Sequence, residues 1–156
     1  MRKRTSQIVR HIYDRLWTVL SYAFAQPMVN AVIDKRLRGE WKYLRETVNE
    51  NAEVRADRAL LEMATLLRVL DDADGLGDLL AQDKQPPLGH VVQADGTTTD
   101  LHFRDMTNKL IHGDSYEWQL GGDDPKIIVH SNEPQRWHSA EINVVRLMGL
   151  IGKWGF

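Results

Sequence analysis

No cysteine occurs among the 156 residues of this chain. Disulfide bonds, thiolate catalysis and cysteine-ligated metal sites are therefore excluded, since each of them needs a thiol. Long apolar runs are scarce as well, and we expect no membrane span. The basic start resembles a signal peptide, but Arg10, Asp14 and Arg15 interrupt the apolar core that such a peptide requires. These absences predict a cytoplasmic protein with no membrane partner.

An excess of either charge is also missing, because the formal net charge is only −2. Residues 1–70 carry 13 basic and 8 acidic side chains, which makes this part +5. Residues 71–156 carry 7 basic and 14 acidic side chains, which makes this part −7. A chain that is acidic overall lacks the basic footprint of most nucleic-acid-binding proteins. An RNA partner is therefore an alternative that we do not favour.

The N-terminal part of the chain shows helical spacing of its apolar residues. The length suits one domain with a proper core, and the spacing predicts three helices, over about residues 6–26, 27–48 and 53–70. Pro27 separates the first two helices, since proline suits the first turn of a new helix. Gly39 then lies inside the second helix, and Asn49 with Asn51 marks the turn before the third.

The pattern changes after residue 70, where acids and glycines end the third helix. We expect residues 71–98 to form a long loop, in which Val91 and Val92 favour a short extended piece. Asp72 and Asp74 match two ligand positions of a calcium-binding loop, but the fifth position is a leucine. The six histidines include no H-x-H or H-E-x-x-H pair. We therefore predict neither a metal nor another cofactor.

The C-terminal part, residues 99–156, combines helices with strands. Tyr116, Trp118 and Leu120 alternate with polar residues, which is typical of a half-buried strand. We expect a central helix, a hairpin, a further strand and a closing helix, over residues 104–113, 116–130, 135–139 and 141–154. The whole chain is then a single α+β domain, mostly helical, with an N-terminal bundle, a long loop and a small antiparallel sheet.

The central helix carries the only stretch with an evident chemical pattern. Arg104, Asn108 and His112 are four residues apart, so they share one face of the helix. Apolar residues occupy the opposite face, where they can anchor the helix in a core. Gly113 follows and is expected to end the helix in the left-handed conformation.

Two interpretations of these three residues remain. Histidine titrates near neutral pH, and a guanidinium beside it can hold a phosphodiester oxygen, so catalysis is one interpretation. In the other, which we favour, Asn108 and His112 hydrogen-bond the following strand, and Arg104 pairs with an acid such as Asp105 or Asp114. The residue types alone fit both interpretations, so they do not decide whether the protein is an enzyme.

The segment RDMTNKLIHG also carries a resemblance. It resembles the R…NK(I/L)IH helix end of bacterial proteins made of helices plus a C-terminal hairpin. It is more loosely similar to HEPN-type helical domains, whose ribonuclease members carry an arginine and a histidine on one helix. That resemblance implies a metal-independent ribonuclease or toxin-like protein, with Arg104 on phosphate, His112 as acid or base, and Asn108 as a polar neighbour. Four to six residues separate the pair in that family, and seven do here.

Binding is the leading functional interpretation. The apolar stripe of the first helix, with Tyr13, Trp17 and Tyr22, is broad for one small core to cover. We therefore expect a small cytoplasmic protein that acts through self-association, as a homo-oligomer or homodimer, or through a protein partner. The alternatives are the HEPN-like ribonuclease and a small-ligand binder with a pocket between the sheet and the helices.

Overall fold

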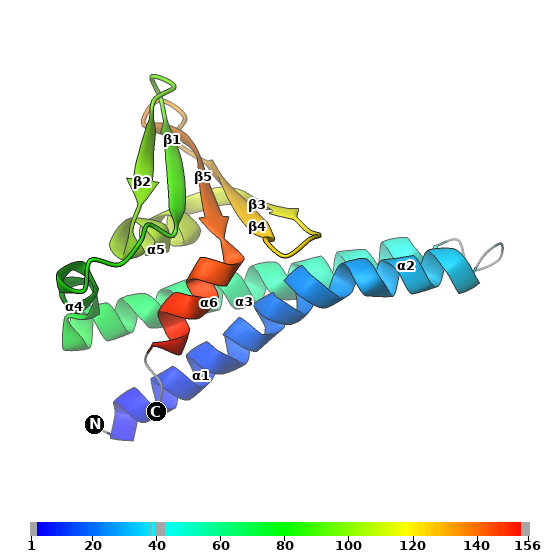
Figure 1. Ribbon diagram of the computed structural model, residues 1–156, viewed down its shortest axis with the longest axis horizontal. Coiled ribbons are helices and arrows are strands. Elements are labelled where there is room, and N and C mark those ends of the chain that lie inside the picture. The colour runs from blue at the N-terminus through cyan, green and yellow to red at the C-terminus, as the bar shows by residue number, and fades with distance from the viewer. Residues whose placement is uncertain (1–2, 38, 40–42, 154–156) are drawn as a thin grey trace.

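The computed structural model describes residues 3–37, 39 and 43–153. The fold is α+β and mostly helical, as predicted. A long helical hairpin forms one layer and a five-stranded sheet rises from its middle (Figure 1). The helices are α1 (Lys3–Leu20), the π-helical turn η1 (Ser21–Ala25), α2 (Gln26–Arg36), α3 (Leu44–Asp74), α4 (Leu76–Gln82), α5 (Phe103–His112) and α6 (Val144–Gly152). The strands are β1 (Gly89–Gln93), β2 (Thr98–Leu101), β3 (Gly113–Gln119), β4 (Lys126–Ser131) and β5 (Trp137–Asn143).

Pro27 lies in the first turn of α2, as predicted, but the predicted interruption is absent, because the chain stays helical from α1 through η1 into α2. Proline inside an α-helix loses a hydrogen bond, and its ring collides with the carbonyl four residues earlier. The wider π-helical turn ends at Ala25, two residues before Pro27, and such turns absorb this kind of conflict within a helix. The proline therefore changes the local winding of the helix instead of ending it.

The chain reversal lies earlier than predicted. α2 ends at Arg36 and α3 begins at Leu44, so two long helical segments replace the three predicted helices. Gly39 lies in the reversal with a φ of +77°, a left-handed conformation that glycine adopts without strain. The apolar spacing continues across the reversal because large apolar residues recur on both helical segments. Trp41, which belongs to that spacing, lies outside the described residues.

Asn49 and Asn51, which predicted a turn, lie inside α3. The side-chain oxygen of Asn49 accepts a hydrogen bond of 2.8 Å from the Gln26 amide on α2. The Asn51 amide donates to the carbonyl oxygen of Thr47 on its own helix. Tertiary and local hydrogen bonds thus satisfy both amides within a helix, which overrides their preference for turns.

The sheet is antiparallel throughout, in the strand order β2-β1-β5-β4-β3. The predicted hairpin is confirmed, since Tyr116 on β3 pairs with Val129 on β4. The third predicted strand extends further than expected, so α6 begins at Val144 and not at 141. Ala140 and Ile142 continue the alternating burial of β5. The Asn143 side chain then accepts a hydrogen bond from the Arg146 N–H, which is an N-cap.

The long loop predicted over residues 71–98 is wrong for most of its length. α3 continues to Asp74, where Gly75 ends it with a φ of +68°. The short helix α4 follows and buries Leu76 and Leu80, and β1 then buries Val91. The seven residues of α4 make only about two helical turns, which is too short for a clear helical period, and β1 does not alternate apolar with polar residues.

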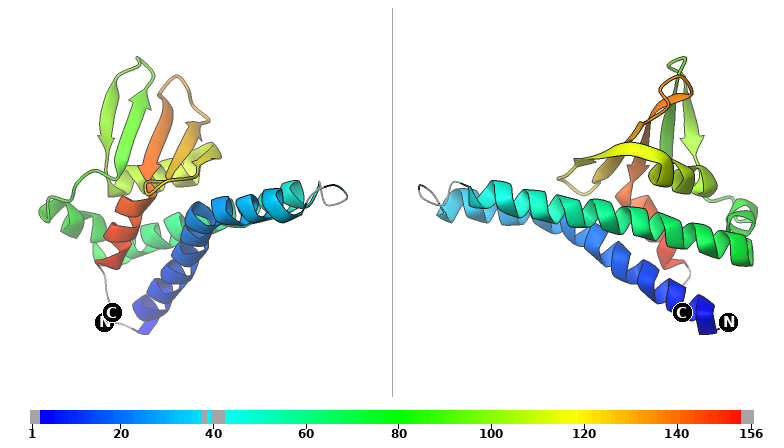
Figure 2. Two further views of the ribbon diagram at one scale, coloured as in Figure 1. Left: turned by 45° about the vertical axis from the view of Figure 1, so that its right-hand side comes forward. Right: turned by 180° about the vertical axis from the view of Figure 1, so that it is seen from behind.

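The core lies where α3, α5 and the sheet meet. α5 lies between α3 and the sheet (Figure 2). α6 packs near α1, where the Tyr13 hydroxyl donates to the Ile151 carbonyl oxygen at 3.1 Å. The largest fully buried side chains come from all of these layers, namely Ile12, Leu60, Met63, Leu67, Met106, Leu110, Ile127, Ile142, Leu147 and Ile151.

One part of the hairpin extends past this core. We call it the arm and define it as residues 24–36 with residues 43–54. It projects beyond the sheet, and only its two helical segments lie beside each other there (Figure 1). Within α3 the buried residues start at Ala56, after the arm has ended. Gln26 and Ile33 are the buried residues of α2.

Candidate functional site

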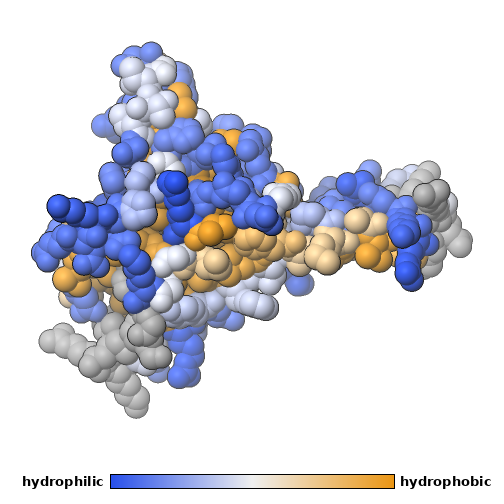
Figure 3. All heavy atoms as spheres, viewed as in Figure 1, coloured by the Kyte–Doolittle hydropathy of each residue, from blue (hydrophilic) through white to orange (hydrophobic). Residues whose placement is uncertain are grey.

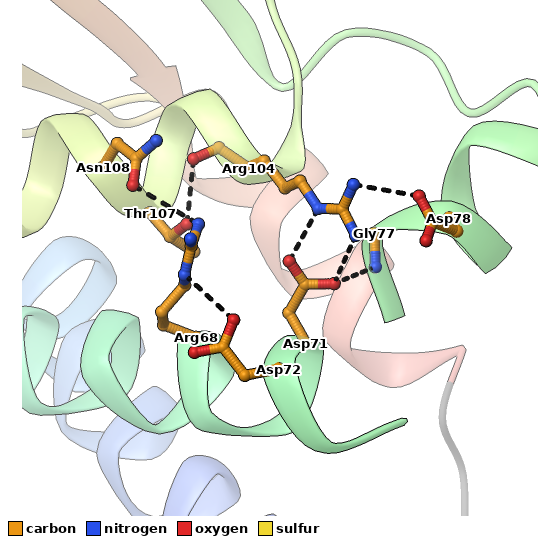
Figure 4. A network of polar contacts seen from close by, with 8 residues as sticks. All are labelled: Arg68, Asp71, Asp72, Gly77, Asp78, Arg104, Thr107 and Asn108. Atoms are coloured by element: carbon orange, nitrogen blue, oxygen red, sulfur yellow. Dashed lines mark hydrogen bonds and ion pairs between the residues drawn. The ribbon is translucent and has the colours of Figure 1, made fainter. Parts of the chain in front are cut away.

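Arg104 is held by two carboxylates from other helices (Figure 4). Its Nε donates to Oδ2 of Asp71 at 2.7 Å, and its Nη2 donates to Oδ1 of the same residue at 3.1 Å. Its Nη1 donates to Oδ1 of Asp78 at 2.9 Å. The acids expected from the sequence, Asp105 and Asp114, are not the ones used. Arg104 thus ties the end of α3 and the start of α4 to α5.

Asp71 is the buried member of this cluster, with 4% of its surface exposed. The Gly77 N–H donates to its Oδ1 at 2.6 Å. The hydrogen bond from Arg104 lowers the pKa of Asp71, and the Gly77 N–H adds to the effect against the cost of burial. A Cβ on Gly77 would lie 2.5 Å from Nε of Arg104, so glycine lets the guanidinium lie against this turn. The cluster is a structural clasp between three helices.

Asn108 and His112 lie apart from this clasp. Oδ1 of Asn108 accepts a long hydrogen bond of 3.4 Å from Arg68, which also pairs with Asp72 (Figure 4). His112 is exposed, and its side chain makes no hydrogen bond to any other residue that the structure describes. Asn108 and His112 line one polar hollow of about 480 Å³ together with Asp105, Lys109, Asn132, Glu133, Arg136 and Trp137.

The joint between α5 and β3 is built from other residues than we expected. The Tyr116 hydroxyl donates to the Leu110 carbonyl oxygen at the end of α5. Gly113 is extended, with φ −69° and ψ 155°, so the predicted left-handed end is wrong. Glycine is needed there for close packing, because a Cβ would lie 2.4 Å from Cγ1 of Val129 and 2.9 Å from the Lys109 carbonyl oxygen. The joint therefore depends on Tyr116 and Gly113.

Arg104 and His112 line two different hollows, so the structure does not bring them together around one ligand. The two cations beside His112 are each paired with an acid. Nζ of Lys109 lies 3.7 Å from Oδ1 of Asp105, and Nη1 of Arg136 lies 2.9 Å from Oε2 of Glu133. The ribonuclease interpretation stays a prediction, and it requires Arg104 to leave its two carboxylates.

The hollow beside Arg104 has a volume of about 370 Å³ and lies between α4, α5, α6 and the segment that leads into β1. Its floor consists of Leu80, Leu88, Phe103 and Leu150, which are all buried. Sequence reasoning missed this site because its residues come from four separate segments. Lys84 has a positive φ of +47° beside this hollow, but a backbone angle cannot be seen in the sequence.

The arm carries an uncovered apolar face. Phe24, Met28 and Val32 follow one another at intervals of four, and 72% of Met28 and 55% of Val32 are exposed. Trp17, on α1 before the arm, is also 72% exposed. An apolar band runs along the hairpin and out over the arm (Figure 3). We call Phe24, Met28, Val29 and Val32 the arm stripe.

One helical stretch of the described chain, Ser6–Arg36, is long and apolar enough to cross a membrane by length and composition alone. Residues 16–33 contain no charged side chain, so our expectation of scarce apolar runs understated this segment. Within this stretch, 33% of the most apolar 18 residues are buried inside the molecule. The same stretch forms one of the two sides of the helical hairpin.

No group of three or more His, Cys, Asp or Glu side chains that could hold a metal ion occurs among the residues described. The calcium-loop acids Asp72 and Asp74 therefore do not form such a group. No family model, curated protein or solved structure matches this chain. The arguments for its function consequently rest on its own residues.

Proposed function

We propose that the protein acts through self-association, as a small cytoplasmic homodimer that pairs through its arm. The arm stripe is the observation that carries this proposal. Large apolar side chains repeat at helical spacing on a segment that no other part of the described chain covers. Contiguous apolar surface of this kind is uncommon on monomers and usually marks a binding face.

Burial of the stripe supplies a driving force for pairing. Fully burying a Met, Val or Phe side chain stabilises by about 1.5–3 kcal/mol relative to leaving it in water. Met28 and Val32 have more than half of their surface still to bury. Pairing must also overcome the loss of translational and rotational freedom, so several such residues are needed together. Four side chains on one face meet this requirement better than a single anchor would.

The charges beside the stripe favour a second copy of the chain as the partner. At the far end of the arm, the described residues among 34–46 carry three basic and two acidic side chains, for a net +1. Residues 47–57, nearer the sheet, carry one basic and three acidic side chains, for a net −2. A two-fold axis through the stripe places the tip of one arm against the base of the other. Opposite charges then meet at both ends of the interface.

The geometry of two paired arms is a familiar one. Each arm contributes two antiparallel helices, so two arms form a four-helix bundle with the stripes in its core.

Membrane insertion is a poorer use of the same stripe. α3 lies against the apolar segment and carries Glu46, Glu50 and Glu53 at the level of the arm. Moving these carboxylates into lipid costs several kcal/mol.

Light scattering tests this proposal with a double variant, Met28→Glu and Val32→Glu. The unmodified protein is expected to have the mass of a dimer at high micromolar concentration, and the double variant that of a monomer. Leu79→Glu is the matched control, because Leu79 on α4 is also 55% exposed but lies outside the arm. A monomeric unmodified protein, or a double variant that stays dimeric, would reject the proposal.

A further inference from the structure

The hollow beside Arg104 has the construction of a ligand site. Its volume of about 370 Å³ lies within the range of small-molecule pockets, about 300–1,000 Å³. Four buried apolar side chains form the floor, namely Leu80, Leu88, Phe103 and Leu150. A smaller hollow of about 180 Å³ shares Gln85, Pro86, Leu88 and Leu150 with it. The two hollows form one groove along residues 85–88.

The rim of this groove is cationic. Lys84 and Arg104 line the larger hollow, Arg146 and Lys153 line the smaller one, and Asp78 is the acid among the lining residues. Arg104 is already balanced by Asp78 and by the buried Asp71 behind it. The other three cations retain their charge towards the groove.

Among the residues that the structure describes, no acid compensates the charge of these three cations. Arg146 donates to the Pro87 carbonyl oxygen at 2.8 Å, and Lys153 donates to the side-chain oxygen of Gln85 at 2.6 Å. Both acceptors are neutral. Lys84 forms no ion pair with any residue in the described part of the chain. An apolar floor under uncompensated positive charge is complementary to an anion with an apolar body.

Lys84, which lines the larger hollow, has an unusual backbone conformation. Its φ of +47° is a left-handed conformation that L side chains rarely adopt, and it is the only non-glycine residue of the described chain with a positive φ. Lys84 directly follows Asp83, the C-cap of α4, and helices commonly end with a left-handed residue at this position. A glycine would relax the backbone at this position but would remove the ammonium group from the rim.

We propose that this groove binds a small amphipathic anion, a medium-chain carboxylate whose acyl chain lies over Leu80, Leu88, Phe103 and Leu150. The carboxylate lies at the rim and accepts hydrogen bonds from Lys84. This function is separate from self-association, because the groove and the arm stripe share no residue.

Titration calorimetry with decanoate, below its micelle concentration, tests the proposal. Decanoate is expected to bind the full-length protein at least about tenfold more tightly than decanol or decylamine, since only decanoate pairs its head with the cations. Equal affinity for decylamine, or no measurable binding of decanoate, would overturn the proposal.

Variants locate the binding site. Ala81→Phe places a ring in the hollow from an exposed position and is expected to abolish binding without lowering the melting temperature. Lys84→Gly is expected to raise the melting temperature by relaxing the backbone, yet weaken decanoate binding about tenfold. Lys84→Arg is expected to restore most of the affinity. Unchanged binding in both Ala81→Phe and Lys84→Gly would contradict the assignment.

The arm stripe is a competing apolar surface, so the arm variant serves as the control. The double variant Met28→Glu and Val32→Glu is expected to bind decanoate as the unmodified protein does. Loss of binding in that variant alone would place the ligand on the arm and overturn the groove assignment.

Discussion

The base and the arm of the helical hairpin both carry large apolar side chains at helical spacing, but only those at the base are covered. At the base, Met63 and Leu67 of α3 are fully buried beneath α5 and the sheet. On the arm, Met28 and Val32 are spaced in the same way and stay mostly exposed. Helical spacing therefore identifies an apolar face but does not identify what covers it. The difference between the two regions is the reason to look for a partner at the arm.

The boundary between the regions is marked by polar and aromatic contacts. Trp118 on β3 stacks edge-on against Tyr22, with ring centroids 5.0 Å apart. Its indole N–H also donates to Asp57 on α3 at 2.7 Å. Beyond this point the buried Gln26 donates to Asn49 on α3, which bridges the two helices, and also to Asn30 on its own helix. These contacts hold the arm in place relative to the body.

The largest difference in the free energy of unfolding is expected between variants of two methionines, Met63 and Met28. Met63→Ala should lower the free energy of unfolding by about 2–5 kcal/mol, because it leaves a cavity in a packed core. Met28→Ala should change it by less than about 0.5 kcal/mol, measured at a concentration where the protein is monomeric. Denaturant unfolding measures both. Equal effects would show that the arm is covered within one chain.

A smaller effect, dependent on pH, is expected at the clasp of Asp71, Arg104 and Gly77. The folded state lowers the pKa of Asp71, so the ionised carboxylate stabilises the folded protein at neutral pH. This stabilisation is lost as the pH falls below about 4 and through the lowered pKa of the folded state. Asp71→Asn should cost about 2 kcal/mol at pH 7, since it weakens charged hydrogen bonds.

The gap in stability between this variant and the unmodified protein should narrow as the pH falls, because Asp71 then becomes protonated. Chemical unfolding at several pH values measures it. Asp34→Asn is a matched control, because Asp34 is an exposed carboxylate on the arm that pairs with Arg45. A gap for Asp71→Asn that stays constant down to pH 3 would contradict the assigned role.

The smallest effect is expected at the bridge between the two arm helices. Gln26→Leu removes the hydrogen bonds to Asn30 and Asn49 and should cost about 1 kcal/mol. It should also increase hydrogen exchange of the arm amides, with little change at the base. Hydrogen exchange resolved by segment measures this difference. Faster exchange at the base alone would place the boundary of the arm elsewhere.

Local patterns predicted part of the fold. The alternation around Tyr116 and the spacing of α5 are decided by neighbours in the sequence, so both elements were predicted. The chain reversal was misplaced because Asn49 carries a turn signal that its contact with Gln26, 23 residues away, overrides. The continuation of the helix through Pro27 depends on a π-helical turn, which has no recognised pattern of residues.

The candidate site was less predictable from local sequence patterns than the fold. The sequence indicated Arg104 as a chemically important residue, but local reasoning paired it with neighbouring acids. Its partner Asp71 is 33 residues away, and only the packing of α3 against α5 brings the two together. The groove beside it could not be predicted, since no single segment contains both its floor and its cations.

Cysteine crosslinking tests arm pairing most directly, because the chain has no cysteine of its own. Met28 lies midway between Phe24 and Val32, so a two-fold axis through the stripe places the two copies of Met28 opposite each other. Under mild oxidation, Met28→Cys should form an intermolecular disulfide much faster than the exposed control Leu79→Cys, since a disulfide requires Cβ atoms about 4 Å apart. Equal crosslinking rates for the two variants would contradict pairing through the arm.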